Sequence, residues 1–267
     1  MLAGLAVSSL WAAALPGADE IVKRSVANTQ ADWRAAPRYN FTERDLLTAN
    51  GKGSKTSRVI MIDGSPYYKL IALNGKPLTP RQAADEERKY QRAIAQRQRE
   101  TPAQRRKRIA ADEKERRQDN ALMGQMAVAF DYRLVGEDTV NGRRCFVLES
   151  TPKPGYRPVS RETEVLTGMR GKMWVDESQF QWVKVQAEVF RRVVFGLFLA
   201  QVEPGTEFTL EQQPVQGNLW LPSHFSMQVK AKVLRLWSHN STDDETYWNY
   251  QPVAEVTKHA RATDPRP

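Results

Sequence analysis

The chain has 267 residues, a length that fits one large domain or two small ones. Apolar residues make up 40% of it and charged residues 27%, which excludes a wholly disordered chain because enough apolar side chains are present to build a core. The formal net charge of +9 favours anionic partners such as phospholipid headgroups, nucleic acid or acidic polymers, without choosing among them.

The N-terminal segment, residues 1–18, indicates export. It carries no charge from Leu2 to Ala18, and its apolar stretch is shorter than the about 20 residues of a membrane-spanning helix. We therefore expect residues 1–18 to be a signal peptide, cleaved after Ala18 or after Ala14, and the mature protein to reach the periplasm or the outer envelope. A buried apolar helix or an uncleaved anchor is the alternative interpretation.

The next segment predicts one helix followed by strands. Asp19 can cap a helix that runs to about Trp33, and Pro37 ends it. The residues Asp63-Gly64-Ser65-Pro66 form a turn signal between two apolar runs, which predicts a hairpin. Strands are expected at residues 39–44, 58–62 and 67–73.

A charged helical insert is expected at residues 79–128. Thr79-Pro80-Arg81-Gln82 is a capping box with proline at the first helical position, and Thr101-Pro102-Ala103-Gln104 repeats it. Each box predicts about twenty residues of helix, as two consecutive helices or one helix bent at Pro102. Because residues 81–119 contain few large apolar side chains, we expect them to be peripheral to the fold.

The densest basic cluster of this insert is Arg105-Arg106-Lys107-Arg108. It is a candidate surface for an anionic membrane or a protein partner. Export argues against nucleic acid as a partner. The competing interpretation is a solvated face of mixed charge, since acidic residues are interspersed in the same helices.

From Phe130 onward the pattern is that of strands. Asn141-Gly142 is the strongest short hairpin signal, and a second hairpin joins residues 172–176 to 182–190. Further strands are expected at 207–212, 225–233 and 245–250. The chain is therefore predicted to be α+β and mainly antiparallel, a strongly curved sheet or an incomplete β-barrel. We expect one domain, residues 19–252, and a disordered tail, residues 253–267.

Motifs for catalysis or metal binding are not found. Cys145 lies in an apolar run and is interpreted as a core residue. His224, His239 and His259 lack neighbours at metal-ligand spacing, and no phosphate-binding glycine loop or nucleophile elbow occurs. We expect no catalytic residue, no metal and no cofactor, and hence no enzyme, although a pair of carboxylates distant in sequence is left open.

Several motifs resemble those of a family of exported bacterial proteins of the outer-membrane lipoprotein-sorting type. They include Ala18-Asp19-Glu20-Ile21-Val22, Gly75-Lys76-Pro77-Leu78-Thr79 and Pro154-Gly155-Tyr156-Arg157-Pro158. Gly171-Lys172-Met173-Trp174-Val175-Asp176 is typical of the broader LolA and LolB group. The resemblance implies an incomplete barrel whose apolar interior holds acyl chains, and an envelope location. It implies no catalytic residue.

These observations lead us to expect binding of a lipid or another amphiphile in an apolar concave pocket. Val183 and Val185 are expected on one face of a strand because side chains alternate. The expected lining of the pocket is Val183, Val185, Phe208, Leu210, Phe225 and Met227. The alternative is a scaffold or protein-interaction module that uses the charged helices. The sequence does not determine the oligomeric state.

Overall fold

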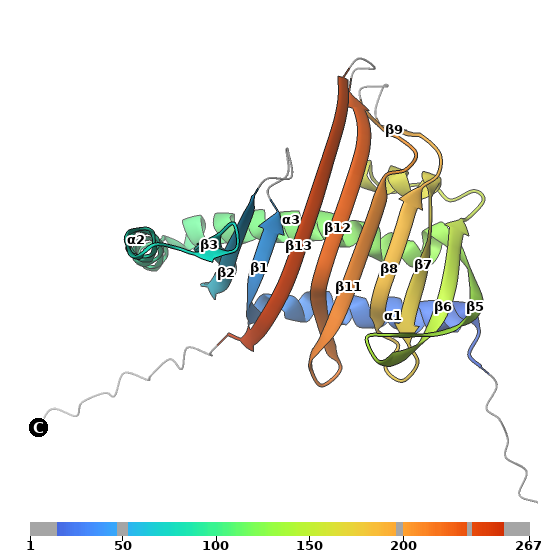
Figure 1. Cartoon of the computed structure of the whole chain (residues 1–267), viewed down its shortest axis with the longest axis horizontal. Coiled ribbons are helices and arrows are strands. Elements are labelled where there is room, and N and C mark those ends of the chain that lie inside the picture. Colours follow the sequence, from blue (N-terminus) through green and yellow to red (C-terminus); the bar gives the residue numbers. More distant parts are fainter. Residues whose placement is uncertain (1–14, 47–52, 196–199, 234–236, 254–267) are drawn as a thin grey trace, which may run out of the picture.

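A computed structural model describes residues 15–46, 53–195, 200–233 and 237–253. One curved antiparallel sheet forms the body of the molecule, and two long helices run along one side of it (Figure 1). The helices are α1 (Ala18–Ala35), α2 (Pro80–Gln98) and α3 (Pro102–Ala129), with short 3₁₀ helices η1 (Ala36–Arg38) and η2 (Glu162–Gly168). The expected α+β fold is confirmed.

The strands are mostly joined in sequential hairpins. Their bounds are β1 (Tyr39–Leu46), β2 (Ser54–Ile62), β3 (Ser65–Leu73), β4 (Lys76–Pro77), β5 (Phe130–Val140), β6 (Arg143–Pro152), β7 (Met169–Asp176), β8 (Trp182–Val189), β9 (Val193–Phe195), β10 (Ala200–Val202), β11 (Glu207–Gln216), β12 (Leu219–Val233) and β13 (Trp237–Pro252).

The order of strands along the sheet is β4-β3-β2-β1-β13-β12-β11-β8-β7-β6-β5, with the short β9 and β10 beside β12. The sheet is open, because its path ends at β4 and at β5. The first strand of the chain, β1, pairs with the last, β13, so these two strands are neighbours in the middle of the sheet.

Helix α1 covers the apolar side of the sheet. Ile21, Val22 and Val26 are buried in the main core cluster against β6, β7 and β8. The helix is capped by Gly17 without a side-chain hydrogen bond, so the expectation that Asp19 caps it is wrong. Asp19 lies in the first turn instead, where its negative charge faces the positive end of the helix dipole.

The sheet presents different residues on its two faces. On β6, Phe146 and Leu148 belong to the cluster under α1, whereas Cys145 belongs to a second cluster with Val183 and Trp220. Successive residues of a strand point to opposite faces. The second cluster therefore packs on the face away from α1, and Cys145 is the buried core residue expected from the sequence.

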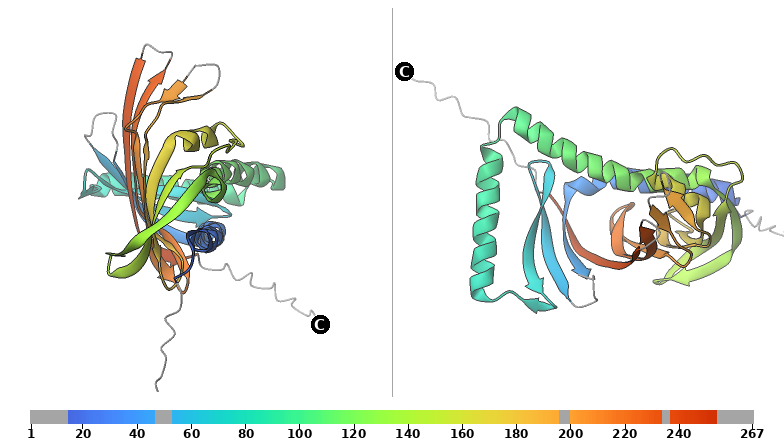
Figure 2. Two further views of the ribbon diagram at one scale, coloured as in Figure 1. Left: turned by 90° about the vertical axis from the view of Figure 1, so that its right-hand side faces the viewer. Right: turned by 90° about the horizontal axis from the view of Figure 1, so that it is seen from above.

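Helices α2 and α3 begin at the two predicted capping boxes. The side chains of Thr79 and Thr101 accept hydrogen bonds from the backbone N–H groups of Gln82 and Gln104. In turn, the side chains of Gln82 and Gln104 accept hydrogen bonds from the backbone N–H groups of Thr79 and Thr101. Two separate helices result. Figure 2 shows α2 at one end of the sheet, beside β3, and α3 running from there towards η2.

Only part of this insert is peripheral. No residue of α2 is buried. The last turns of α3 differ, because Met123, Met126 and Ala127 pack against the cluster under α1, and Ala129 is fully buried. The expected peripheral segment, residues 81–119, thus ends where α3 reaches the core.

Two arginines attach the insert to the turn between β2 and β3. The Arg97 guanidinium donates hydrogen bonds of 2.9 Å to the backbone oxygens of Ile62, Ser65 and Pro66. Arg108 donates to the Ser65 hydroxyl at 2.6 Å. These contacts fix α2 and the start of α3 without apolar burial.

Most of the expected signal peptide and of the expected tail lies outside the described residues. Ala18 begins α1 and packs against the core, so the described structure starts close to the expected cleavage positions. Among the described residues, no helix is both long and apolar enough to span a membrane.

Candidate binding face

The register of the sheet aligns side chains of neighbouring strands in rows on the face that α1 covers. The first row changes character along its length, from apolar on five strands to acidic on two. From β6 to β1 it consists of Leu148, Met173, Val185, Leu210, Phe225, Glu245 and Asp45.

A second row lies beside the first and changes in the same place. It contains short side chains in its middle, between two aromatic residues. From β5 to β13 it consists of Tyr132, Ser150, Gly171, Ala187, Phe208, Met227 and Asp243. In both rows the apolar part ends on β12 and a carboxylate follows on β13.

Helix α1 covers only part of this apolar surface. Val185 is buried, and Phe208 and Leu210 are partly buried against the cluster under α1. Phe225 and Met227 on β12 are partly buried but lie outside that cluster. The rings of Phe208 and Phe225 are 6.0 Å apart, so the covered and the less covered parts are continuous.

One of the six expected lining residues is placed elsewhere. Val183 packs with Cys145 and Trp220 on the opposite face from Val185. The cause is a β-bulge, because Trp174 pairs with Lys184 while the next residue, Val175, pairs with Trp182. An extra residue in one strand shifts the alternation of side chains, and the expectation that Val183 and Val185 share a face is therefore wrong.

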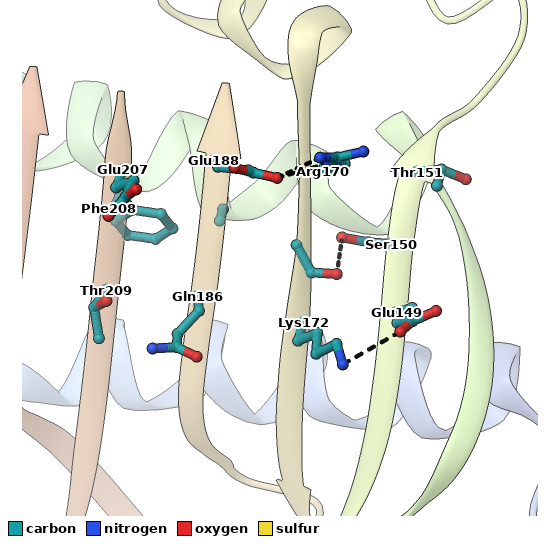
Figure 3. Close-up of a pocket in the computed structure, with 12 residues that line it drawn as sticks. Glu149, Ser150, Thr151, Arg170, Lys172, Gln186, Glu188, Glu207, Phe208 and Thr209 are labelled. Carbon is teal, nitrogen blue, oxygen red and sulfur yellow. Dashed lines mark hydrogen bonds and ion pairs between the residues drawn. The ribbon is translucent and has the colours of Figure 1, made fainter. Parts of the chain in front are cut away.

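A hollow of about 540 Å³ lies beside the second row (Figure 3), and eight of its twelve lining residues alternate with that row, so their side chains point to the face away from α1. Of the six expected lining residues, only Phe208 contributes to it. Four of its five charged residues form ion pairs, Arg170 with Glu188 and Lys172 with Glu149. The remaining lining is Ser150, Thr151, Gly171, Gln186, Ala187, Glu207 and Thr209. The hollow is thus more polar than the expected apolar pocket.

The acidic end of the rows is unusual in its electrostatics. Burial and the nearby carboxylates of Glu245 and Asp45 raise the pKa of Glu43 to about 7. The Tyr247 hydroxyl donates a hydrogen bond to Glu245. Partial burial and the Glu43 carboxylate also raise the pKa of Tyr68, on β3, although this residue is still 56% exposed. Carboxylates and phenols therefore gather on β1, β3 and β13, where the apolar rows stop.

A buried polar contact joins α1 to the sheet. Asp32 accepts hydrogen bonds from the backbone of Trp220 and the side chain of Gln181, and burial raises its pKa to about 6. The Thr29 hydroxyl and the Trp182 indole nitrogen are buried there without a hydrogen-bond partner in the described structure. Such groups are usually satisfied by internal water.

The basic cluster predicted from the sequence does not act as one surface. The Arg108 guanidinium binds both carboxylate oxygens of Glu100, at 2.8 and 2.7 Å, and is therefore committed within the protein. Arg105 lies 3.6 Å from Asp63. Arg106 and Lys107 are exposed. Only these last two remain available in full to an external partner.

In the described part of the chain, no group of three or more His, Cys, Asp or Glu side chains is arranged to hold a metal ion. The histidine whose side chain is described, His224, pairs with Asp244 at 3.1 Å. Burial raises the pKa of the Cys145 thiol to about 11, which disfavours the reactive thiolate.

The acidic end of the binding face was missed by sequence reasoning. The signal was present on β13, where Asp243, Glu245 and Tyr247 alternate with other residues. Alternation shows that these three share a face. It does not show that this face continues the apolar one of β12, because that depends on the pairing register.

No family model and no curated protein matches the chain. Among solved structures, a putative outer membrane lipoprotein-sorting protein domain from Vibrio parahaemolyticus is 10% identical, with a TM-score of 0.36 over 89% of this chain and 95% of that one. A DUF1329 family protein from Desulfovibrio piger is 13% identical, with a TM-score of 0.31 over 90% and 95%. A LolA superfamily protein from Nitrosomonas europaea is 13% identical, with a TM-score of 0.31 over 89% and 94%.

These solved structures are of the lipoprotein-sorting and LolA group that the sequence motifs resemble. Solved structures of the group that the motifs resemble are thus among those similar to this chain.

Proposed function

We propose that the protein binds the apolar chain of a lipid or another amphiphile along the sheet face under α1. One observation carries this proposal. The apolar rows extend beyond the α1 cluster to Phe225 and Met227 on β12, and carboxylates follow at once on β13. An amphiphile has the same order of parts, an apolar chain next to a polar head.

The apolar part of the rows offers a surface for such a chain. Phe208, Phe225 and Met227 lie next to one another on β11 and β12, with Phe208 paired to Met227. Each methylene buried there contributes about 0.8 kcal/mol. Beside Phe208 the second row continues with the short side chains of Ala187, Gly171 and Ser150, over which an apolar chain can extend.

An envelope location is part of the proposal and rests on the N-terminal sequence. Residues 1–18 have the composition of a secretory signal, and α1 begins at Ala18. N-terminal sequencing of the mature protein should find a start between Leu15 and Asp19. Intact protein recovered from the cytoplasm alone would contradict export.

The test is native mass spectrometry of the protein purified from its own envelope. The wild type should carry co-purified lipid, and the double variant Phe225→Ser/Met227→Ser should carry much less. The control is Val159→Ser, which removes an apolar side chain that is 69% exposed and outside the rows. Thermal unfolding of each variant checks that it is folded. Wild-type protein free of lipid, or equal lipid in all three proteins, would refute the proposal.

The alternative function is that of an interaction module built on the charged helices. The observation in its favour is that α2 has no buried residue yet is held firmly by Arg97, so its exposed face is presented in a fixed position. Exchange of residues 81–96 for a neutral helix of equal length separates the two functions. Lipid binding should survive the exchange, whereas binding to a protein partner should be lost.

A further inference from the structure

A second hollow, of about 520 Å³, lies at the elbow between α2 and α3. Its lining comes from the last two turns of α2 and the first turn of α3. The residues are Arg92, Ala95, Gln96, Arg99, Glu100 and Gln104. Arg92, Gln96 and Arg99 are four and three positions apart, so they occupy one side of α2 and converge on the elbow.

The two arginines of this hollow are not engaged elsewhere. Arg97, which lies between them in the sequence, and Arg108 are committed to the β2–β3 turn and to Glu100. Within the described structure, the guanidinium groups of Arg92 and Arg99 make no hydrogen bond or ion pair, and both residues are exposed. The elbow therefore holds two guanidinium groups available to a ligand.

The acidic residue of the hollow does not cancel this charge. Both oxygens of the Glu100 carboxylate accept hydrogen bonds from Arg108, at 2.8 and 2.7 Å. Its negative charge is thus compensated by a residue that does not line the hollow. Arg92 and Arg99 remain as the excess positive charge.

Two amide side chains complete the lining. Gln104 uses its side-chain oxygen to accept from the backbone nitrogen of Thr101, which leaves its amide N–H groups free to donate. Gln96 is exposed beside the two arginines. Arginine guanidinium groups and amide N–H donors are groups that proteins use to bind phosphate oxygens.

We propose that this elbow hollow, defined by Arg92, Gln96, Arg99 and Gln104, binds the phosphate group of a phosphate ester. The guanidinium groups of Arg92 and Arg99 donate hydrogen bonds to some of the phosphate oxygens. The side-chain amides of Gln96 and Gln104 donate to the remaining phosphate oxygens. A volume of about 520 Å³ exceeds that of a phosphate alone and admits the organic group attached to it. Such an ester occurs as a lipid headgroup or as a free metabolite.

The experiment compares two double variants of the full chain that lose the same charge. Arg92→Gln/Arg99→Gln removes the guanidinium groups of the hollow. Arg106→Gln/Lys107→Gln removes two exposed basic residues that lie on the first turns of α3 but do not line it. Circular dichroism confirms that both variants are folded.

Two ligands distinguish the sources of the phosphate ester. One is glycerol 3-phosphate, measured by calorimetry. The other is vesicles of phosphatidylcholine with phosphatidylglycerol, measured by co-sedimentation against vesicles of phosphatidylcholine alone. We expect Arg92→Gln/Arg99→Gln to weaken binding by about tenfold or more, because charge-assisted hydrogen bonds are lost, and Arg106→Gln/Lys107→Gln by about twofold or less.

Binding of glycerol 3-phosphate that depends on Arg92 and Arg99 supports a site for free esters, and vesicle binding with the same dependence supports a site for headgroups. Equal weakening of vesicle binding by the two variants would overturn the proposal, since that is the result of unspecific surface attraction. Absence of binding to both ligands would overturn it as well. Because the elbow lies apart from Phe225 and Met227, these outcomes do not depend on the amphiphile proposal.

Discussion

The sheet has two halves, one under α1 with β6, β7 and β8 and the other with β1, β2 and β3. Both are antiparallel, but the side chains that they bury under the helices differ in polarity. Under α1, strands β6, β7 and β8 contribute a buried core of Leu148, Met173, Val175 and Trp182. The other half carries Glu43 and Asp45 on β1, and several of its buried residues are polar. These are Thr42, Ser54, Thr56 and Ser65.

The difference follows from the helix that covers each half. Helix α1 packs Ile21 and Val22 against the β6–β8 half and shields it from the solvent. Over the other half α3 presents a charged stretch, and the carboxylates of Asp112 and Glu115 act on the pKa of Tyr68. One half of the sheet therefore forms an apolar core, whereas the other half carries a charged surface. The proposed ligand lies at the boundary between them.

The largest expected effect distinguishes the two halves by burial. Ile21 is fully buried under α1, whereas Ile71 on β3 is 39% exposed. Ile21→Ala should lower the free energy of unfolding by about 2–5 kcal/mol, because it leaves a cavity in a packed core. Ile71→Ala should lower it by about 1 kcal/mol or less. Urea denaturation measures both, and equal losses would show that the β3 half is packed as tightly as the α1 half.

The next effect concerns how the charged insert is held to the β1–β3 half. Arg97→Gln removes the three hydrogen bonds to the β2–β3 turn and should lower the free energy of unfolding by about 1.5–3 kcal/mol. Arg92→Gln, five residues earlier on the same helix, should leave it nearly unchanged. Urea denaturation of the two variants tests this. A negligible loss in Arg97→Gln would mean that the insert folds without this attachment.

Two glycine substitutions should have opposite signs. A Cβ at Gly171, in the middle of the apolar half, would collide with the backbone oxygen of Gln186. Gly171→Ala should therefore destabilise the protein by about 1–3 kcal/mol. Gly124 lies within α3, with its nearest neighbour, Gln30, 3.9 Å from an added Cβ. Gly124→Ala should stabilise it by about 0.5–1 kcal/mol through helix propensity. Thermal unfolding gives both signs, and destabilisation by Gly124→Ala would indicate closer packing of α1 on α3.

The smallest effect is a pH dependence that belongs to the charged half. The pKa of Glu43 is about 7 in the folded protein against an ordinary value of 4.5, so between these values the folded state binds more protons than the unfolded state. The free energy of unfolding should then fall as the pH rises from about 4.5 to about 7, and level off above.

Glu43→Gln removes this titration. The variant should be more stable than the wild type by about 1 kcal/mol at about pH 8, after allowance for solvent screening, and equally stable near pH 4.5. Urea denaturation at a series of pH values measures the difference. An identical pH profile in the two proteins would show that Glu43 is ionised at little cost, and that the charged half is more hydrated than its burial indicates.

The sequence by itself determined the local structure. The capping boxes at Thr79 and Thr101, the turn at Asp63-Gly64 and the turn at Asn141-Gly142 are all present as predicted. Each depends on hydrogen bonds or backbone angles within about four residues, so neighbouring residues suffice to specify it.

Only the tertiary structure decided which of these elements meet. The pairing of β1 with β13 and of β8 with β11 joins segments far apart in the sequence, and their register follows from packing of the whole sheet. The bulge that moves Val183 to the opposite face and the ion pair that commits Arg108 to Glu100 have no local signature. The place where the apolar rows end and the carboxylates begin was likewise fixed by contacts between distant residues, because side-chain alternation within one strand carries no information about its neighbour.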